Sequence, residues 1–412
     1  MSQIPSASNS SVTPGHETLS LVEPTVMFHC RVRKSPFFKS TRKAGARAFS
    51  TYNHMWLPSY YTDPDDEYWA LVNHVTLWDV SVERMVEITG PDAFVLTNML
   101  TPRDLTKCKV GQCKYIVVCD EYGGILNDPV LARLGENHFW LALADSDLIL
   151  WVKALAFGLK MDVRVTEPDV SPLQIQGPKS RDLMVDLFGN LIDGIKHYHC
   201  IEAALDGIPL LLTRTGYTGE LGYEIYLRDG SRAEDLWDRI VTAGKPYKIQ
   251  PIGPCNVRRI EAGMMSLGFD MTMDDNPYQI YEPKMLKWLV DLEQDADFIG
   301  KEALARINSE GVKRKLVGIE IPGDRIVSAL DAFEKTHWDI RAGAEIIGDL
   351  RSMGYSPKLE TTIGFAMVPI EYAELGMRLD IALPCGDTRE ATVVEKPFVD
   401  PEQRIQKAQI AG

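Results

Sequence analysis

The last hundred residues carry a pattern that strongly limits how this chain can fold. Short apolar runs rich in β-branched residues recur there at regular spacing with Gly and Pro between them, at 316–321, 345–347, 363–368, 379–381 and 392–394. This spacing is typical of a small antiparallel sandwich or barrel. The residues before about Lys313 mix helical and strand patterns instead. We therefore expect a separate all-β domain over residues 313–412.

The preceding residues divide into a tail and a mixed region. The first eighteen residues are rich in Ser, Thr and Pro and lack the apolar core of a secretion signal. We therefore expect residues 1–48 to form a disordered or extended arm. Residues 49–312 show strands, helices and two glycine-containing hairpins, at 115–134 and 209–227. This mixture without regular alternation predicts an α+β fold.

The negative net charge limits the kinds of partner that this protein can bind. The 412 residues contain 58 Asp and Glu against 44 Lys and Arg, which leaves a formal charge of −14. Such a field repels phosphate backbones and anionic membrane surfaces. No stretch approaches the roughly 18 apolar residues that cross a bilayer. We expect neither a nucleic acid nor a membrane as partner.

The cysteines indicate a reducing compartment. There are seven, an odd number, without a C-x-x-C pair. Cys108, Cys113 and Cys119 are the closest group, but they lie in or beside an apolar strand, where buried thiols are common. We expect no metal site and a cytoplasmic location.

Eight short motifs, in one order along the chain, resemble the aminomethyltransferase family, which includes the T-protein of the glycine cleavage system. They run from about residue 50 to 402: LWDVS at 77–81, QGP at 176–178, FIGK at 298–301, YSP at 355–357, PFVDP at 397–401, and the longer GGILND at 123–128, GYTGELGYEI at 216–225 and RIEAG at 259–263. The resemblance implies a three-domain T-protein-like fold. Two interleaved α+β domains over 49–312 would form a central folate channel, and a C-terminal antiparallel β-barrel would follow.

A branch of this family, the dimethylsulfoniopropionate demethylases, is more similar than the glycine-cleavage enzymes. The shared segments are RVRKSPFF at 31–38, YNHM at 52–55, NDP at 127–129, RRIE at 258–261, GFDM at 268–271 and DNP at 275–277. In two places the chain departs from the glycine-cleavage pattern. Val82 and Glu83 replace a His-Met pair after Ser81, and Pro254, Cys255 and Asn256 replace a segment that holds an arginine. Both departures argue against a lipoyl carrier protein as donor.

The resemblance assigns roles to six residues. Asp128 would be the catalytic acid near N5 of tetrahydrofolate, and the residues that bind the cofactor would be Tyr115, Tyr217, Glu224, Arg258 and Trp288. Each has a structural alternative. Asp128 fits a turn-capping aspartate, Glu224 a solvent-facing strand residue, and the tyrosines core packing. Arg258 fits a helix-surface salt bridge, and the residues before Trp288 differ from the family pattern.

The resemblance therefore implies a tetrahydrofolate-dependent demethylase. It would move a methyl group from a small donor, such as the sulfonium dimethylsulfoniopropionate, to N5 and give 5-methyltetrahydrofolate. The alternatives are an aromatic O-demethylase, an N-methyl or aminomethyl transferase, and a folate-binding protein without turnover. An aryl ether needs an acid to protonate its leaving group, for which His54, His197 and Tyr198 are available.

Overall fold

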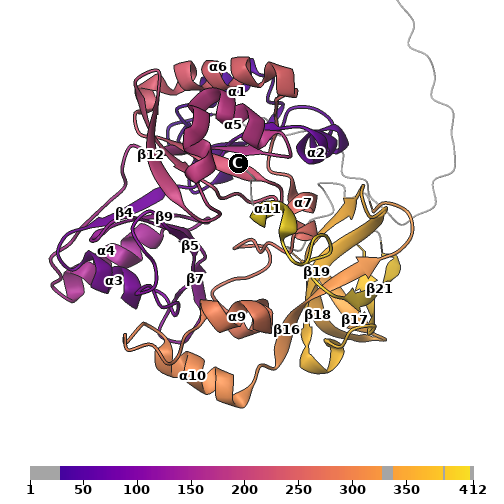
Figure 1. The fold of residues 1–412 in the computed structure, drawn as a ribbon. Coiled ribbons are helices and arrows are strands. Elements are labelled where there is room, and N and C mark those ends of the chain that lie inside the picture. The colour runs from indigo at the N-terminus through magenta and orange to yellow at the C-terminus, as the bar shows by residue number, and fades with distance from the viewer. Residues whose placement is uncertain (1–27, 327–336, 384–385, 409–412) are drawn as a thin grey trace, which may run out of the picture.

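Three bodies of β structure make up the protein (Figure 1). The structure is a computed structural model that describes residues 28–326, 337–383 and 386–408. Two open sheets and their helices occupy the first two thirds of the chain, and a barrel follows. Among the described residues, no helix is both long and apolar enough to span a membrane.

The first body is a six-stranded sheet. Its strands, in order across the sheet, are β12 (Cys200–Leu205), β13 (Ile208–Thr213), β14 (Gly222–Leu227), β11 (Ser171–Gln176), β3 (Thr76–Asp79) and β15 (Gln250–Pro251). The pairs are antiparallel except β15 with β3. Helices α5 (Ser180–Phe188) and α6 (Ala233–Gly244) contribute apolar side chains to the core beneath one face. Every residue of β11 and β14 is buried, which shows that both faces of the sheet are covered.

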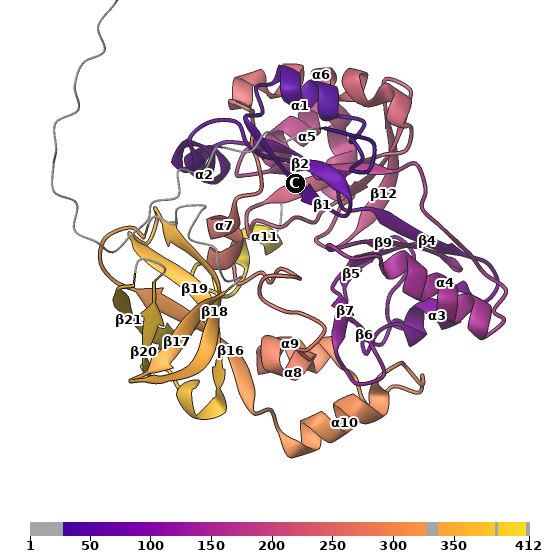
Figure 2. The same cartoon turned by 180° about the vertical axis from the view of Figure 1, so that it is seen from behind.

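The second body is a five-stranded antiparallel sheet. Its strands are β10 (Arg164–Thr166), β4 (Met85–Thr89), β9 (His138–Ala142), β8 (Val130–Gly135) and β5 (Cys113–Tyr115). Helices α3 (Ala93–Met99) and α4 (Leu148–Gly158) share an apolar core with it. A further cluster joins both sheets, with Met85 and Trp140 from this sheet and Leu211 and Tyr226 from the other. The sheets thus face each other between two helical layers (Figures 1 and 2).

The chain crosses between the two sheets twice. It leaves the six-stranded sheet after β3, enters the five-stranded sheet at β4, and returns at β11. Residues 80–84 therefore form a crossing between the sheets.

The N-terminal part packs on the first sheet. It contains α1 (Phe38–Lys43), the hairpin of β1 (Ala48–Tyr52) and β2 (Met55–Tyr60), and α2 (Pro64–Asn73). Residues 1–27 of the predicted arm lie outside the described residues. In the described part, Phe37 is fully buried and belongs to the core of the six-stranded sheet. Residues 37–48 are therefore a folded segment anchored by apolar burial rather than an arm.

Short elements fill the space between the sheets and the barrel. They are the strand pair β6 (Val118–Cys119) and β7 (Ile125–Asn127), and the helices α7 (Asn256–Glu261), α8 (Pro277–Ile280), α9 (Pro283–Leu289) and α10 (Lys301–Glu310). Their apolar side chains form one cluster with barrel residues such as Phe365. In both views β5 and β7 lie on the side that faces α9 (Figures 1 and 2).

The third body confirms the predicted C-terminal barrel. It is closed and has six antiparallel strands, in the order β16 (Arg314–Ile321), β19 (Thr361–Pro369), β18 (Glu345–Ser356), β17 (Trp338–Ala342), β20 (Arg378–Ala382) and β21 (Thr388–Val394). Alternating apolar side chains such as Ile319, Ile340 and Val393 fill its interior. Helix α11 (Arg404–Lys407) follows it.

Candidate functional site

Asp128 lies in the loop between β7 and β8. Tyr115 ends β5, which pairs with β8, and its hydroxyl donates to Asp128 Oδ2 at 2.8 Å. The Tyr115 hydroxyl also lies 2.7 Å from the hydroxyl of Tyr281, which follows α8. The fold thus brings two sequence-predicted residues into direct contact. Tyr281, 166 residues after Tyr115, joins them without any sequence signal.

The two oxygens of the Asp128 carboxylate differ in their surroundings. Oδ2 accepts the Tyr115 hydrogen bond, whereas Oδ1 is buried and has no hydrogen-bond partner. Burial raises the pKa of Asp128 to about 7, although the Tyr115 hydrogen bond acts in the opposite direction and the charge of Asp270 adds to the rise. A carboxyl group with this pKa exchanges protons readily near neutral pH.

The glycine pair before Asp128 explains how this loop is positioned. A Cβ atom on Gly124 would lie 2.2 Å from the backbone oxygen of Met273, so a larger residue would push the two segments apart. The next residue, Ile125, donates its backbone N–H to the oxygen of Asp275 at 3.0 Å. Close backbone packing against the segment before α8 therefore fixes the approach to Asp128.

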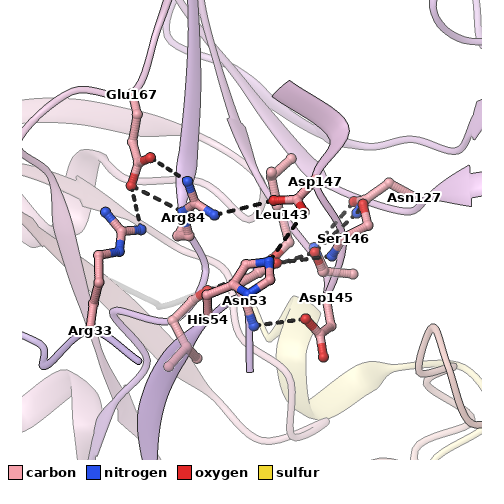
Figure 3. A network of polar contacts seen from close by, with 12 residues as sticks. Arg33, Asn53, His54, Arg84, Asn127, Leu143, Asp145, Ser146, Asp147 and Glu167 are labelled. Carbon is pink, nitrogen blue, oxygen red and sulfur yellow. Dashed lines mark hydrogen bonds and ion pairs between the residues drawn. The ribbon is translucent and has the colours of Figure 1, made fainter. Parts of the chain in front are cut away.

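Two buried asparagines hold the backbone on either side of the site (Figure 3). Asn53, in the turn between β1 and β2, donates to the oxygens of Val82 (2.9 Å), Leu143 and Ala144. It also accepts from the N–H of Ser146 at 2.9 Å.

Asn127, directly before Asp128, bonds the same loop. Its amide donates to the Ala144 oxygen and the Ser146 hydroxyl, and its carbonyl accepts from Ala144 N–H. One loop after β9 thus fixes both the 80–84 crossing, through Asn53, and the position of Asp128, through Asn127.

Charged side chains extend this network toward the surface (Figure 3). Arg84 pairs with Glu167 at 2.5 Å and with Asp147 at 3.6 Å, and Arg33 also pairs with Glu167. His54 Nε2 lies 3.1 Å from Asp147. The side chain of Arg84 is therefore committed to partners on the outer side of the crossing.

Glu224 lies on β14 and is 4% exposed, so it is not a solvent-facing strand residue. Its Oε2 accepts from the hydroxyls of Thr215 and Tyr226, both at 2.6 Å, and from Thr213 at 3.3 Å. Its Oε1 accepts only from the amide of Gln174, at 2.9 Å. The Gln174 Oε1 atom is then left buried without a partner. Gln174 Oε1 is thus a second buried acceptor without a donor, after Asp128 Oδ1.

Tyr217 lies in the glycine-rich loop between β13 and β14, and its hydroxyl donates to the backbone oxygen of Met265 at 2.7 Å. Burial raises its pKa, and the negative charge of Asp128 contributes to this rise. Tyr217 therefore lies within electrostatic reach of Asp128.

Arg258 and Trp288 lie apart from the Tyr115–Asp128 contact. Arg258 is 1% exposed and forms ion pairs with Glu220 (2.8 Å) and Glu261 (3.2 Å). The alternative to cofactor binding for Arg258 was a salt bridge on a helix surface. Arg258 does form salt bridges, but they lie in the core. Trp288 on α9 is exposed, and the Arg103 guanidinium lies 4.5 Å from its ring centre. Arg103 also donates to the backbone oxygen of Tyr115, which links Trp288 to the site.

Glu83 is a further acidic residue in this region, and no sequence motif assigned it a role in the site. It lies in the 80–84 crossing, and its carboxylate makes no hydrogen bond or ion pair with the residues that the structure describes. The departure from the His-Met pattern at residues 82–83 was the only sequence signal that pointed to Glu83.

The described residues contain no group of three or more His, Cys, Asp or Glu side chains arranged to hold a metal ion.

Family models cover most of the chain. The N-terminal domain model of the glycine cleavage T-protein matches residues 37–294, and the T-protein C-terminal barrel domain matches 314–400. The chain belongs to the glycine cleavage T-protein family. The predicted class of enzyme, a tetrahydrofolate-dependent transferase, is thereby confirmed.

Members of the T-protein family with different names are similar over nearly the full length. Dimethylsulfoniopropionate demethylase DmdA of Ruegeria pomeroyi is 34% identical over 365 residues, which is 89% of this chain and 97% of that protein. An aminomethyltransferase of Desulfitobacterium hafniense is 30% identical over 372 residues, 89% of this chain and 98% of the relative. The crystal structure of the glycine cleavage system aminomethyltransferase T of Bartonella henselae has the same fold. It has a TM-score of 0.77 and 24% identity, and the match covers 90% of this chain and 99% of that one.

Proposed function

We propose that this T-protein family member is a demethylase that transfers a methyl group from a small dimethylsulfoniopropionate-like sulfonium to N5 of tetrahydrofolate, giving 5-methyltetrahydrofolate. The observation that carries the proposal is the Asp128 carboxyl group. Its Oδ1 atom is buried without a hydrogen-bond partner, and burial raises the pKa of the group to about 7. The higher identity to a sulfonium demethylase than to the aminomethyltransferases supports the choice of donor.

The buried acceptors fit a folate. Tetrahydrofolate carries N–H donors on the amino-pyrimidine edge of its pterin and at N5, and Gln174 Oε1 and Asp128 Oδ1 are buried acceptors that lack a donor. Buried polar atoms are nearly always satisfied in native proteins, so a pair of orphaned acceptors points to a donor-bearing ligand. Glu224, beside Gln174, would take the pterin edge, and Tyr115 and Tyr217 would shape its slot. Trp288 and Arg258 remain proposals for more distant parts of the cofactor.

Asp128 would supply the proton acceptor. Tetrahydrofolate, when bound, supplies a nucleophilic N5 that carries one hydrogen. Transfer to N5 forms the N–C bond while the electron pair of the broken C–S bond returns to sulfur, which becomes a neutral thioether. Asp128 accepts the proton that N5 loses. Alignment of donor and acceptor at near-attack distance supplies much of the rate, because the methyl group is already activated by the positive sulfur.

The O-demethylase alternative requires an acid beside the ether oxygen. Burial lowers the pKa of His197 to about 4, with the charge of Arg214 contributing, so its imidazole is neutral at pH 7. His54 lies at the surface with Asp147 as partner. Neither histidine has the properties of that acid, and burial raises the pKa of Tyr198, which makes its phenol a weaker acid. The sulfonium is therefore the better candidate donor. We place the reaction in the cytoplasm, because the six described cysteines are free thiols.

A donor panel tests the proposal. Purified protein is incubated with tetrahydrofolate and dimethylsulfoniopropionate, dimethylglycine, glycine betaine, vanillate or syringate, and 5-methyltetrahydrofolate is measured by mass spectrometry. We expect product from the sulfonium. Product from an aryl ether instead would establish the O-demethylase, and folate binding without product from any donor would support a binding protein.

A further inference from the structure

Glu83 is a carboxylate that the proposed reaction has not used. It lies between β3 and β4, where the chain crosses from one sheet to the other, and it retains partial exposure. Its backbone N–H donates to the oxygen of Val80, but its carboxylate has no hydrogen-bond or ion-pair partner in the described part of the chain. A carboxylate in such a position normally has a cation or several N–H donors around it.

The groups that act on Glu83 are negative or neutral. Burial raises the pKa of Glu83 well above its ordinary value, and the charges of Glu224 and Asp128 add to the rise. Burial also raises the pKa of the Tyr52 and Tyr226 phenols, and the charge of Glu83 adds to that effect in both. The hydrogen bonds agree with this placement, because Asn53 binds the oxygen of Val82 and both Asn53 and Asn127 bind the oxygen of Ala144. The chain beside Glu83 and the chain beside Asp128 are thus held to the same loop.

The backbone around Glu83 is held from both sides. Asn53 binds the oxygen of Val82, and the side chain of Arg84 is paired with Glu167 and Asp147 (Figure 3). The nearest cation along the chain is therefore occupied elsewhere and cannot neutralise Glu83. The fold thus holds a carboxyl group without a cation at the site, and repulsion from two acidic neighbours opposes its ionisation until a positive charge arrives.

A second kind of observation indicates what the site accepts. Gln174, 1% exposed, has a buried Oε1 without a partner, and Asp128 has the same at Oδ1. Both residues belong to the surroundings of Glu83. The charges of Asp128 and Glu224 act on Glu83, and Gln174 donates a hydrogen bond to Glu224. The unsatisfied groups around Glu83 are thus all acceptors. Such a site, which holds acceptors and carboxyl groups but no paired cation, is complementary to a positively charged ligand.

We propose that Glu83 is the counter-charge for the methyl donor, and that this enzyme selects methylated cations, sulfonium or quaternary ammonium, over neutral methyl ethers. This inference rests on the proposed function and names the charge class of its donor. The same attraction favours product release, because transfer of the methyl group turns the cation into a neutral thioether or amine. The donor is then held by charge only until the reaction is complete.

Calorimetric binding tests the inference. The probes are dimethylsulfoniopropionate and its product 3-methylthiopropionate, which keeps the carboxylate but has an uncharged thioether sulfur. The proteins are wild type, Glu83→Gln, Glu83→Asp and the control Glu310→Gln, an exposed residue at the end of α10. We expect Glu83→Gln to weaken sulfonium binding by about tenfold or more. Thioether and tetrahydrofolate binding should stay unchanged, which also shows that the variant is folded. Glu83→Asp should restore part of the affinity, and Glu310→Gln should match wild type.

Proton release provides a second readout. Since a bound cation stabilises the ionised form of Glu83, sulfonium binding near pH 7 should release protons into the buffer in wild type and fewer in Glu83→Gln. Equal sulfonium affinity and equal proton release in both proteins would overturn the inference, even if the wild type forms 5-methyltetrahydrofolate. Glu83-dependent cation binding without any methyl transfer would instead uphold the inference and refute the proposed reaction.

Discussion

At the scale of single residues, Asp128 combines one satisfied and one orphaned oxygen. Asp128→Asn keeps the shape of the side chain and its contact with Tyr115 but removes its ability to take a proton. We expect methyl transfer to fall by about two to four orders of magnitude, the usual contribution of a positioned acid or base. Tetrahydrofolate affinity should change far less, as measured by equilibrium fluorescence. Equal losses in turnover and in folate binding would remove the catalytic role.

Tyr115 sets the working pH of Asp128. Its hydrogen bond stabilises the carboxylate and so holds the pKa of Asp128 below the value that burial alone would impose. In Tyr115→Phe that pKa should rise, and the acidic limb of the pH–rate profile, near pH 7 in wild type, should move to higher pH. Single-turnover rates between pH 5.5 and about 9 would show the shift. Tyr60→Phe, at an exposed position, is the control, and an unmoved profile would exclude this link.

How far the sequence predicts the site differs from residue to residue. Asp128 lies in a motif and Tyr115 is assigned by the family resemblance, and the two lie thirteen residues apart in one predicted hairpin. Tyr281 and Gln174 lack such a signal, because each reaches the site through contacts between distant segments. Glu83 stood out only as a departure from a pattern. Its importance depends on which charges surround it, and those come from three separate elements.

At the scale of elements, the turn between β1 and β2 fastens the 80–84 crossing. Asn53→Ala would leave the carbonyls of Val82, Leu143 and Ala144 without this donor. We expect the free energy of unfolding to fall by about 1–3 kcal/mol, measured by urea denaturation, together with slower methyl transfer. Asn73→Ala, at the exposed end of α2, should change stability by less than about 0.5 kcal/mol. Similar stability of both variants would show that the network does not hold the crossing.

Sequence patterns located most elements but misjudged some limits. The apolar spacing over 252–262 predicts a helix, yet α7 begins only at Asn256, because Pro254 disfavours helical geometry in the residue before it. The apolar run at 115–119 predicts one continuous strand, but the structure divides it into β5 and β6, which pair with β8 and β7 respectively. An unbroken apolar run carries no signal of such an interruption.

At the scale of the whole molecule, Asp275 couples the barrel to the site. Its buried carboxylate pairs with Arg351 of β18 and Arg314 of β16, and its backbone oxygen binds Ile125 on the strand before Asp128. Asp275→Ala leaves Arg351 partly uncompensated, so we expect about 3 kcal/mol of destabilisation and reduced turnover. Glu390→Ala, which breaks an exposed pair with Arg378, should cost less than about 1 kcal/mol. Equal effects in denaturant unfolding would contradict the coupling.

The barrel was predictable at this scale because its strands are local and regularly spaced. The face-to-face packing of the two open sheets was not predictable from periodicity. Their shared cluster joins Met85 and Trp140 to Leu211 and Tyr226, and the chain crosses between the sheets on the way. Only the family resemblance anticipated such interleaving.

The central claim is methyl transfer from the sulfonium to N5. The most direct test is a single-turnover reaction in which the S-methyl groups of dimethylsulfoniopropionate carry deuterium. The enzyme, saturated with tetrahydrofolate, is quenched at intervals and the folate pool is analysed by mass spectrometry. We predict that the deuterated methyl group appears on N5 and that an equal amount of thioether forms. Folate that stays unlabelled while the protein binds both ligands would contradict methyl transfer from the sulfonium.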